Sequence, residues 1–198
     1  MRHIYLIFIV CIFSCNQKQK SSPKLVNENI NKTEADDQID KLNKAILSDP
    51  SNAKLYGNRA TYYTAIKEYE KAEQDFQKSI EINPNDPIIW DNYGTLKSRR
   101  NDFKKAFKAY STAVELSPSN SQFINNAGWS LLNISEFEES IKYFDKAIRI
   151  DSTFNQAYLN KGLALIGLQQ NKQGCMLLHA LVNRGFSDAQ TYIDNYCR

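Results

Sequence analysis

Apolar residues recur along most of this sequence at the spacing of an amphipathic α-helix. A clear run consists of Phe137, Ile141, Phe144 and Ile148. Three such runs end shortly before a proline, at Pro50, Pro84 and Pro118. Because proline cannot continue a helix, the pattern predicts a succession of helices joined by short turns.

The pattern has a fixed period, because consecutive prolines of this set stand 34 residues apart. In the same register, a large residue recurs at Tyr56, Trp90, Ile124 and Tyr158. A small residue follows four positions later, at Ala60, Gly94, Gly128 and Gly162. A repeat of this length is typical of a solenoid, in which each repeat buries its apolar face against its neighbours.

Residues 53–86, 87–120 and 121–154 are three consecutive copies of this pattern. Position 17 of each copy is aromatic (Tyr69, Phe103 and Phe137), and so is position 24 (Phe76, Tyr110 and Phe144). Positions 8, 20 and 27 are small, which lets two helices approach while the large residues fill the space between them. In these features the sequence resembles the tetratricopeptide repeat (TPR). The resemblance implies an all-α fold, a right-handed TPR solenoid of antiparallel helix pairs.

The two ends of the chain carry weaker versions of the repeat. Residues 36–52 resemble the second half of a repeat, and we expect an N-terminal half-repeat there. Residues 155–198 predict a degenerate fourth repeat and a C-terminal capping helix, with an end that resembles the Sel1-type repeat. Gly174 stands where the family has alanine, so we expect the second helix of this repeat to pack poorly.

The N-terminus resembles that of a bacterial lipoprotein. A ten-residue apolar run, too short to span a bilayer comfortably, fits a signal peptide over residues 1–14. Ser14 and Cys15 then resemble a lipobox, which predicts lipid attachment at Cys15 and a place at the outer membrane facing the periplasm. The alternative is an ordinary secretory signal with an incidental cysteine. The polar residues 15–35 predict a flexible tether.

Two cysteines remain if the signal peptide is removed and Cys15 carries lipid, namely Cys175 and Cys197. An even number of cysteines in an oxidising compartment favours a disulfide. A helical hairpin that turns near Gly185 places Cys175 ten residues before the turn and Cys197 twelve residues after it, at nearly equal height on antiparallel helices. We therefore predict a disulfide between them, and two buried free thiols are the alternative.

Composition argues against some classes of partner and offers no reactive centre. The 25 basic residues barely outnumber the 22 acidic ones, for a formal charge of +3, which is no footprint for nucleic acid. Of the two histidines, only His179 lies outside the expected signal peptide. No close cysteine pair, His-Glu motif or phosphate-binding glycine loop occurs. We therefore expect no catalytic residue, no metal site and no cofactor.

Two charged residues depart from the family pattern. Arg59 replaces a residue that is usually aliphatic, and Lys97 replaces one that is usually aromatic. We expect both side chains to lie along apolar neighbours with their charged ends in solvent.

Candidate binding residues come from the first helix of each pair, because this helix lines the inner groove in the family. Its sixth position is asparagine in all four repeats, at Asn58, Asn92, Asn126 and Asn160. An amide both donates and accepts hydrogen bonds, so it can hold an extended peptide backbone of any sequence. The alternative is that these amides bridge neighbouring repeats. The apolar candidates in the same groove are Trp129, Leu132 and Leu163.

These features predict a membrane-tethered TPR scaffold that mediates protein–protein or peptide binding in a bacterial envelope assembly. The partner would be a protein or peptide in the concave groove, with no nucleic acid and no enzymatic activity. One alternative is an accessory protein that holds envelope peptide or glycan for a partner enzyme. Another, from a different class, is a small hydrolase.

Overall fold

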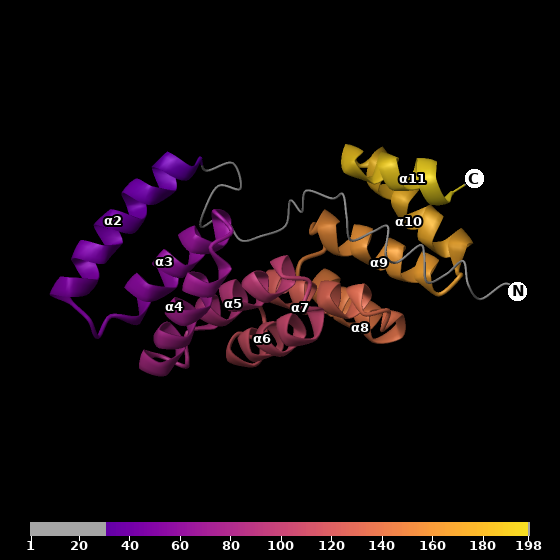
Figure 1. Cartoon of the computed structure of the whole chain (residues 1–198). Coiled ribbons are helices and arrows are strands. Elements are labelled where there is room, and N and C mark those ends of the chain that lie inside the picture. The colour runs from indigo at the N-terminus through magenta and orange to yellow at the C-terminus, as the bar shows by residue number, and fades with distance from the viewer. Residues whose placement is uncertain (1–30, 198) are drawn as a thin grey trace, which may run out of the picture. The chain divides into compact units, whose positions relative to one another are not determined.

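The computed structural model describes residues 31–197, and throughout this range the chain is helical, with turns and no strand (Figure 1). The described residues form two compact units, 31–118 and 119–197. The first unit contains α2 (Lys32–Ser48), α3 (Ala53–Ala65), α4 (Tyr69–Ile82), α5 (Pro87–Arg99) and α6 (Phe103–Leu116). The second contains α7 (Ser121–Asn133), α8 (Phe137–Ile150), α9 (Asn155–Gly167), α10 (Asn171–Asn183), the 3-10 turn η1 (Ser187–Ala189) and α11 (Gln190–Tyr196). The prediction of an all-α fold built from helix pairs is confirmed.

The helices keep the repeat register of the sequence. The four first helices, α3, α5, α7 and α9, have 13 residues each and occupy the same repeat positions. Each is followed by a left-handed residue, at Lys67, Asn101, Ser135 and Gln169. The amide after each of these bonds back five residues, as Glu68 does to Tyr63 and Gln170 to Leu165. The fourth pair therefore turns like the three clear repeats, although its sequence is degenerate.

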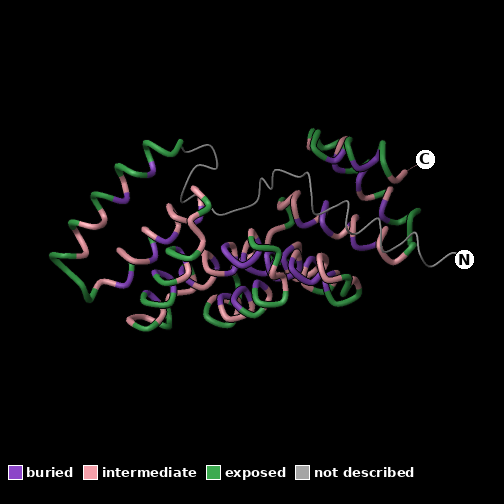
Figure 2. Tube along the Cα trace, viewed as in Figure 1, coloured by how far each residue is buried: buried purple, intermediate pink, exposed green. Residues whose placement is uncertain are grey.

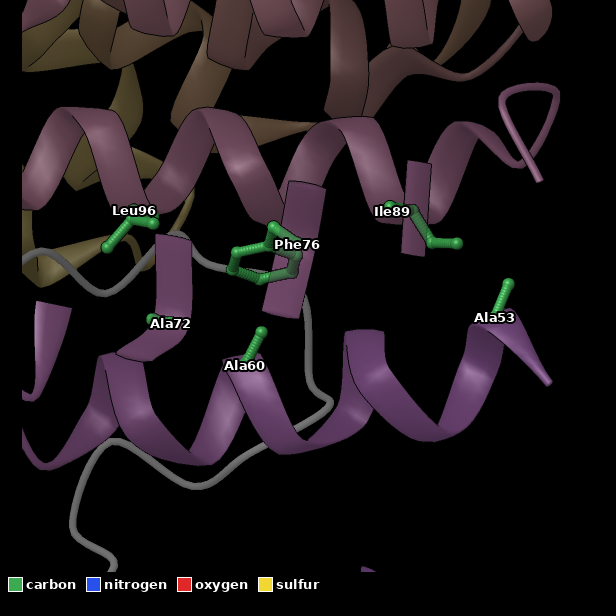
Figure 3. Close-up of a cluster of buried hydrophobic side chains, with 6 residues drawn as sticks. All are labelled: Ala53, Ala60, Ala72, Phe76, Ile89 and Leu96. Carbon is green, nitrogen blue, oxygen red and sulfur yellow. The ribbon is translucent and has the colours of Figure 1, made fainter. Parts of the chain in front are cut away.

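Small and large residues meet between the two helices of each pair, as the sequence predicts. In the first unit Ala60 and Phe76 belong to one buried cluster (Figure 3). In the second unit a Cβ added to Gly128 would lie only 2.8 Å from the ring of Phe144. Because the first helix has no side chain at this position, the large residue of the second helix can fill the space between the two helices.

Gly174 does not loosen the fourth pair, so our expectation of poor packing there is wrong. Gly174 is buried, and a Cβ at this residue would lie 2.7 Å from the carbonyl oxygen of Gly162. Glycine replaces alanine because the backbones of α9 and α10 approach more closely than a methyl group allows. The two backbones therefore meet directly at Gly174 and Gly162.

Helix α2 has the register of a second helix but begins earlier than the sequence suggested. Asn31 caps it by accepting a hydrogen bond from the Glu34 amide at 2.8 Å, so the helix takes in residues 32–35, for which the sequence predicts a tether. It ends at Ser48, one full repeat before Ile82, the last residue of α4. Without a first helix beside it among the described residues, its positions 20, 24 and 27 are half-buried rather than buried (Figure 2); these are Gln38, Leu42 and Ala45.

Helix α11 has the register of a first helix. Tyr192 follows Tyr158 by one full repeat, and α11 packs on α10 as α5 packs on α4. It has seven residues where the other first helices have 13. Its position eight is Tyr196, whereas the four preceding first helices carry alanine or glycine there. We therefore assign α11 as the capping helix.

Among residues 31–197, none of the helices has the length and hydrophobicity that crossing a membrane requires. The expected signal peptide, Cys15 and most of the expected tether lie outside the described residues.

Candidate functional site

The repeated asparagine behaves differently in the two units. In the first unit Asn58 is exposed and Asn92 is half-buried. Neither side chain makes a hydrogen bond within the described residues. Each amide group can therefore offer two donors and an acceptor to a ligand.

In the second unit the same repeat position is drawn into the protein. Asn160 is only 5% exposed, and its Nδ2 donates to Oδ1 of Asn125 on α7 at 3.0 Å. Gln156 in turn donates to Oδ1 of Asn160 at 3.1 Å. Asn126 is 2% exposed and accepts a weaker bond from Gln122 at 3.4 Å. The side chain of Asn160 thus bridges two repeats, which is the alternative role considered for this position.

The apolar candidates all lie in the second unit. Trp129 and Leu132 are partly exposed on α7, and Asn133 donates to the carbonyl oxygen of Trp129 at 2.7 Å. Leu163 on α9 is partly buried and packs against the C-terminal cluster that includes Tyr192 and Ile193. Trp129 and Leu132 therefore present apolar surface to solvent, while the C-terminal cluster covers part of the Leu163 side chain.

Hydroxyl groups make the first-helix face of the first unit less polar than its sequence suggests. Thr61 donates to the carbonyl of Gly57 at 2.9 Å, and Thr64 donates to that of Ala60 at 2.8 Å. Thr95 does the same to Asp91 at 3.1 Å. Because these hydroxyl protons are used within their own helices, the amides of Asn58 and Asn92 are the better donors on this face.

Arg59 does not extend into solvent as expected, so that prediction is wrong. Its Nε and Nη2 bind the two carboxylate oxygens of Asp75 on α4 at 2.6 and 2.7 Å. Its Nη1 donates to Asn43 on α2 at 2.7 Å, and its side chain is only 19% exposed. The paired, planar guanidinium fastens α2, α3 and α4 together, which a solvent-directed side chain would not do.

The prediction that the charged end of Lys97 lies in solvent is also wrong. Its side chain is only 7% exposed and forms an ion pair with Glu73 on α4. Tyr93 donates to the same carboxylate at 2.8 Å, and the Lys97 ammonium lies 4.7 Å from the centre of the Tyr93 ring. Burial alone would raise the pKa of Glu73, but the hydrogen bonds from Lys97 and Tyr93 outweigh it and hold the pKa below its ordinary value. Sequence reasoning missed both pairs because it weighed each charge alone, not against the facing helix.

A disulfide joins the two cysteines that the sequence had paired. Cys175 on α10 and Cys197 after α11 have Cα atoms 5.6 Å apart. Both residues are partly exposed. The bond ties the capping helix to the fourth pair.

Within residues 31–197, no group of three or more His, Cys, Asp or Glu side chains is arranged to hold a metal ion. His179 is exposed on α10. The acidic side chains described above serve ion pairs between helices.

Comparisons with known proteins identify the repeat. Models of the tetratricopeptide repeat match residues 53–86 and 94–153. The chain is a tetratricopeptide-repeat protein. The fourth TPR pair lies outside the matched residues, although its turn has the same geometry. A search of curated proteins gave no match.

Three solved structures with the same fold are distant in sequence. MamA is 19% identical, with 83% of this chain and 91% of that one covered and a TM-score of 0.68. The pilF protein of Pseudomonas aeruginosa is 17% identical, with 81% of each chain covered and a TM-score of 0.66. YrrB, described as a TPR protein with an unusual peptide-binding site, is 18% identical over 76% of this chain and 79% of that one, with a TM-score of 0.66. The likeness to these structures shows the fold alone. The tetratricopeptide-repeat family, whose models match the chain, is generally a non-catalytic scaffold for binding proteins or peptides.

Proposed function

We propose that this TPR protein binds an extended segment of a partner protein along its first-helix faces, while a lipid on Cys15 holds it at a membrane of a bacterial envelope. The observation that carries the binding role is the pair of unbonded amides at Asn58 and Asn92. They stand at the same repeat position on the first helices of consecutive repeats. A polar side chain that the fold does not use is available to a ligand.

The ligand chemistry follows from the amide group. An amide can donate to a backbone carbonyl and accept from a backbone amide, so it recognises an extended chain without requiring a particular sequence. In the second unit, Trp129 and Leu132 are partly exposed and offer a separate apolar surface to partner side chains. Asn126 and Asn160 belong to the same predicted set, but their burial gives them the role of supporting α7 and α9.

Binding is tested with an array of short peptides of randomised sequence, probed with the purified protein. Replacing both Asn58 and Asn92 by alanine removes two hydrogen-bonding groups, so we expect affinity for the best peptides to fall about tenfold. The matched control replaces Gln74 and Gln77, two exposed amides on the second helix α4. Equal binding by the asparagine variant, at an unchanged melting temperature, would remove the amides from the site.

The apolar surface of the second unit is tested with its own variant. Trp129→Ala should weaken the binding of peptides that contain large apolar residues by roughly 30-fold, since a buried tryptophan anchor contributes about 2 kcal/mol or more. Peptides without such residues should be much less affected. A uniform loss across the array would instead indicate that Trp129 supports the fold.

The membrane anchor rests on the sequence around Cys15. Two acyl chains with a diacylglyceryl group would give stable attachment, since each buried methylene contributes about 0.8 kcal/mol. The full-length protein, expressed in a bacterium, should enter the detergent phase on partitioning, and Cys15→Ala should leave it in the aqueous phase. The lipoprotein assignment fails if both proteins partition alike, and that result would leave the peptide-binding proposal intact.

A further inference from the structure

The C-terminal cap, residues 186–197, stands in the place of a fifth first helix. Tyr192 continues the register of Tyr158, yet α11 has only seven residues. A helix of this length is marginal without packing. The position of the cap therefore depends on what fastens it to α10.

Apolar contacts supply part of this fastening. Ala189, Tyr192 and Ile193 are buried in a cluster with residues of α9 and α10, which are Leu159, Leu178 and Leu181. The connection between α10 and the cap runs through Gly185, which is exposed, has φ of +84° and would have no atom within 4 Å of an added Cβ. Two backbone hydrogen bonds join this connection to α10, from Gly185 to Val182 at 2.9 Å and from Phe186 to Leu181 at 3.0 Å. The backbone at Gly185 is the point about which the cap would turn when its contacts to α10 are broken.

The cap is also joined to α10 by a covalent bond, the disulfide between Cys175 and Cys197. Cys175 stands at repeat position 21. In the first unit this position is occupied by Glu73, whose side chain reaches Lys97 on the following first helix. Cys197 lies directly after α11, at the end of the cap farthest from Gly185. Both cysteines are partly exposed, so a small reductant can reach the bond. We propose that the Cys175–Cys197 disulfide is a reducible latch that holds the cap closed.

The latch opens by thiol–disulfide exchange with a dithiol. One thiolate of the reductant attacks a sulfur of the protein disulfide, and the other sulfur leaves with the electron pair and takes a proton. The second thiol of the reductant then resolves the mixed disulfide. In balance, the dithiol gives two electrons and two protons and becomes a disulfide, and Cys175 and Cys197 become thiols.

Opening would uncover apolar residues that the closed cap buries. Leu178 and Leu181 have almost no exposed surface in the closed state. Closing a loop of this length with a disulfide suppresses opening by on the order of 100-fold in the chain-entropy model. Reduction should therefore raise the open population of the cap by about that factor, while the helix pairs remain folded.

Hydrogen exchange on the full chain, read by mass spectrometry, tests the latch. The wild-type protein is compared before and after dithiothreitol, and thiols are counted by alkylation in the same samples. Amides of α11 should exchange on the order of 100-fold faster after reduction, and those of α8 should not change. The dye ANS should bind more strongly to the reduced protein.

The double variant Cys175→Ser/Cys197→Ser is the matched control. Its α11 amides should exchange as fast as those of the reduced wild type, and adding dithiothreitol should not change their exchange rate. The exchange rate of the α8 amides should equal that of the wild type. If this variant fails to fold, the reduced wild type gives the answer alone. The latch is refuted by any of three results: thiols already free in protein from an oxidising compartment, a bond that dithiothreitol cannot reduce in the folded protein, or a reduced protein with unchanged exchange in α11.

Discussion

The two units share one backbone register but fasten their helices with different chemistry. In the first unit, charged groups reach between helices, as Arg59 does to Asp75 and Lys97 to Glu73. In the second unit, a hydrogen bond between two amides joins α9 to α7, and a disulfide joins α10 to the residue after α11. An ion pair also occurs there, between Lys161 and Asp145 at 2.6 Å, but it is more exposed than the two pairs of the first unit.

The difference separates what the repeat requires from what it tolerates. Both units need a small residue facing a large one, and both need the left-handed turn inside the pair. The contacts that join one helix to the next can be ionic, amide or covalent. Because the fasteners differ, the same substitution should have different effects in the two units.

Removing Glu73 should give the largest effect. Glu73→Leu leaves the Lys97 ammonium buried without its carboxylate, and loss of one partner of a buried pair costs about 3 kcal/mol or more. The double variant Glu73→Leu/Lys97→Met replaces the pair by apolar groups of similar size and should regain most of the loss. Urea unfolding of the three proteins measures this. Additive losses in the double variant would show that the two charges do not depend on each other.

The repeated asparagine gives a direct comparison of the units. Asn160→Ala removes a buried amide and leaves Asn125 and Gln156 without their partner, so we expect a loss of about 2 kcal/mol. Asn58→Ala changes an exposed side chain at the same repeat position and should stay within about 0.5 kcal/mol of wild type. Thermal unfolding of both variants measures the contrast. Equal losses at the two sites would contradict the division of roles drawn above.

Acid should weaken the ionic unit through Glu73. Its pKa in the folded protein is lower than the ordinary 4.5, so its contribution to stability is complete above that value and is lost as the pH falls through the folded pKa. The wild type should therefore lose stability below about pH 4.5 faster than Glu73→Leu/Lys97→Met does. The difference should be modest, because solvent screens a partly exposed carboxylate. Parallel pH profiles of the unfolding free energy would argue against it.

The turns should give the smallest effect and should not distinguish the units. Lys67 and Gln169 have φ of 66° and 63°, a conformation that costs a side chain about 1 kcal/mol relative to glycine. Glycine at either residue relieves this cost but loses more entropy on folding, so each variant should gain about 0.5 kcal/mol. Melting temperatures of Lys67→Gly and Gln169→Gly should rise by similar amounts. A gain in one unit and a loss in the other would mean that the turns are not equivalent.

The sequence predicted the features that depend on local pattern. The repeat register, the helix pairs and the facing of small and large residues all follow from which residue type recurs where. The pairing of Cys175 with Cys197 came from helix geometry, since ten and twelve residues measured from one turn reach the same height.

The sequence failed where a side chain depends on the helix that faces it. Arg59 and Lys97 were judged from their own helices, and their partners lie 16 and 24 residues away on α4. Comparing opposite charges across facing repeat positions would have found both pairs. Gly174 was judged against the family alanine, whereas its partner is the backbone of Gly162. The four asparagines looked equivalent, because only the neighbouring residues distinguish a bridging amide from an exposed one.

The tyrosine at position eight of the cap has a consequence for how such an array could lengthen. A duplicated repeat inserted before residue 186 would carry alanine or glycine at position eight of its first helix. Its second helix could then pack closely on that small residue. A duplicate placed after Tyr196 would have to pack its second helix on a residue much larger than the alanine or glycine of the other repeats. Gene duplication could therefore add repeats to the interior of this protein while its capped C-terminal end is inherited unchanged.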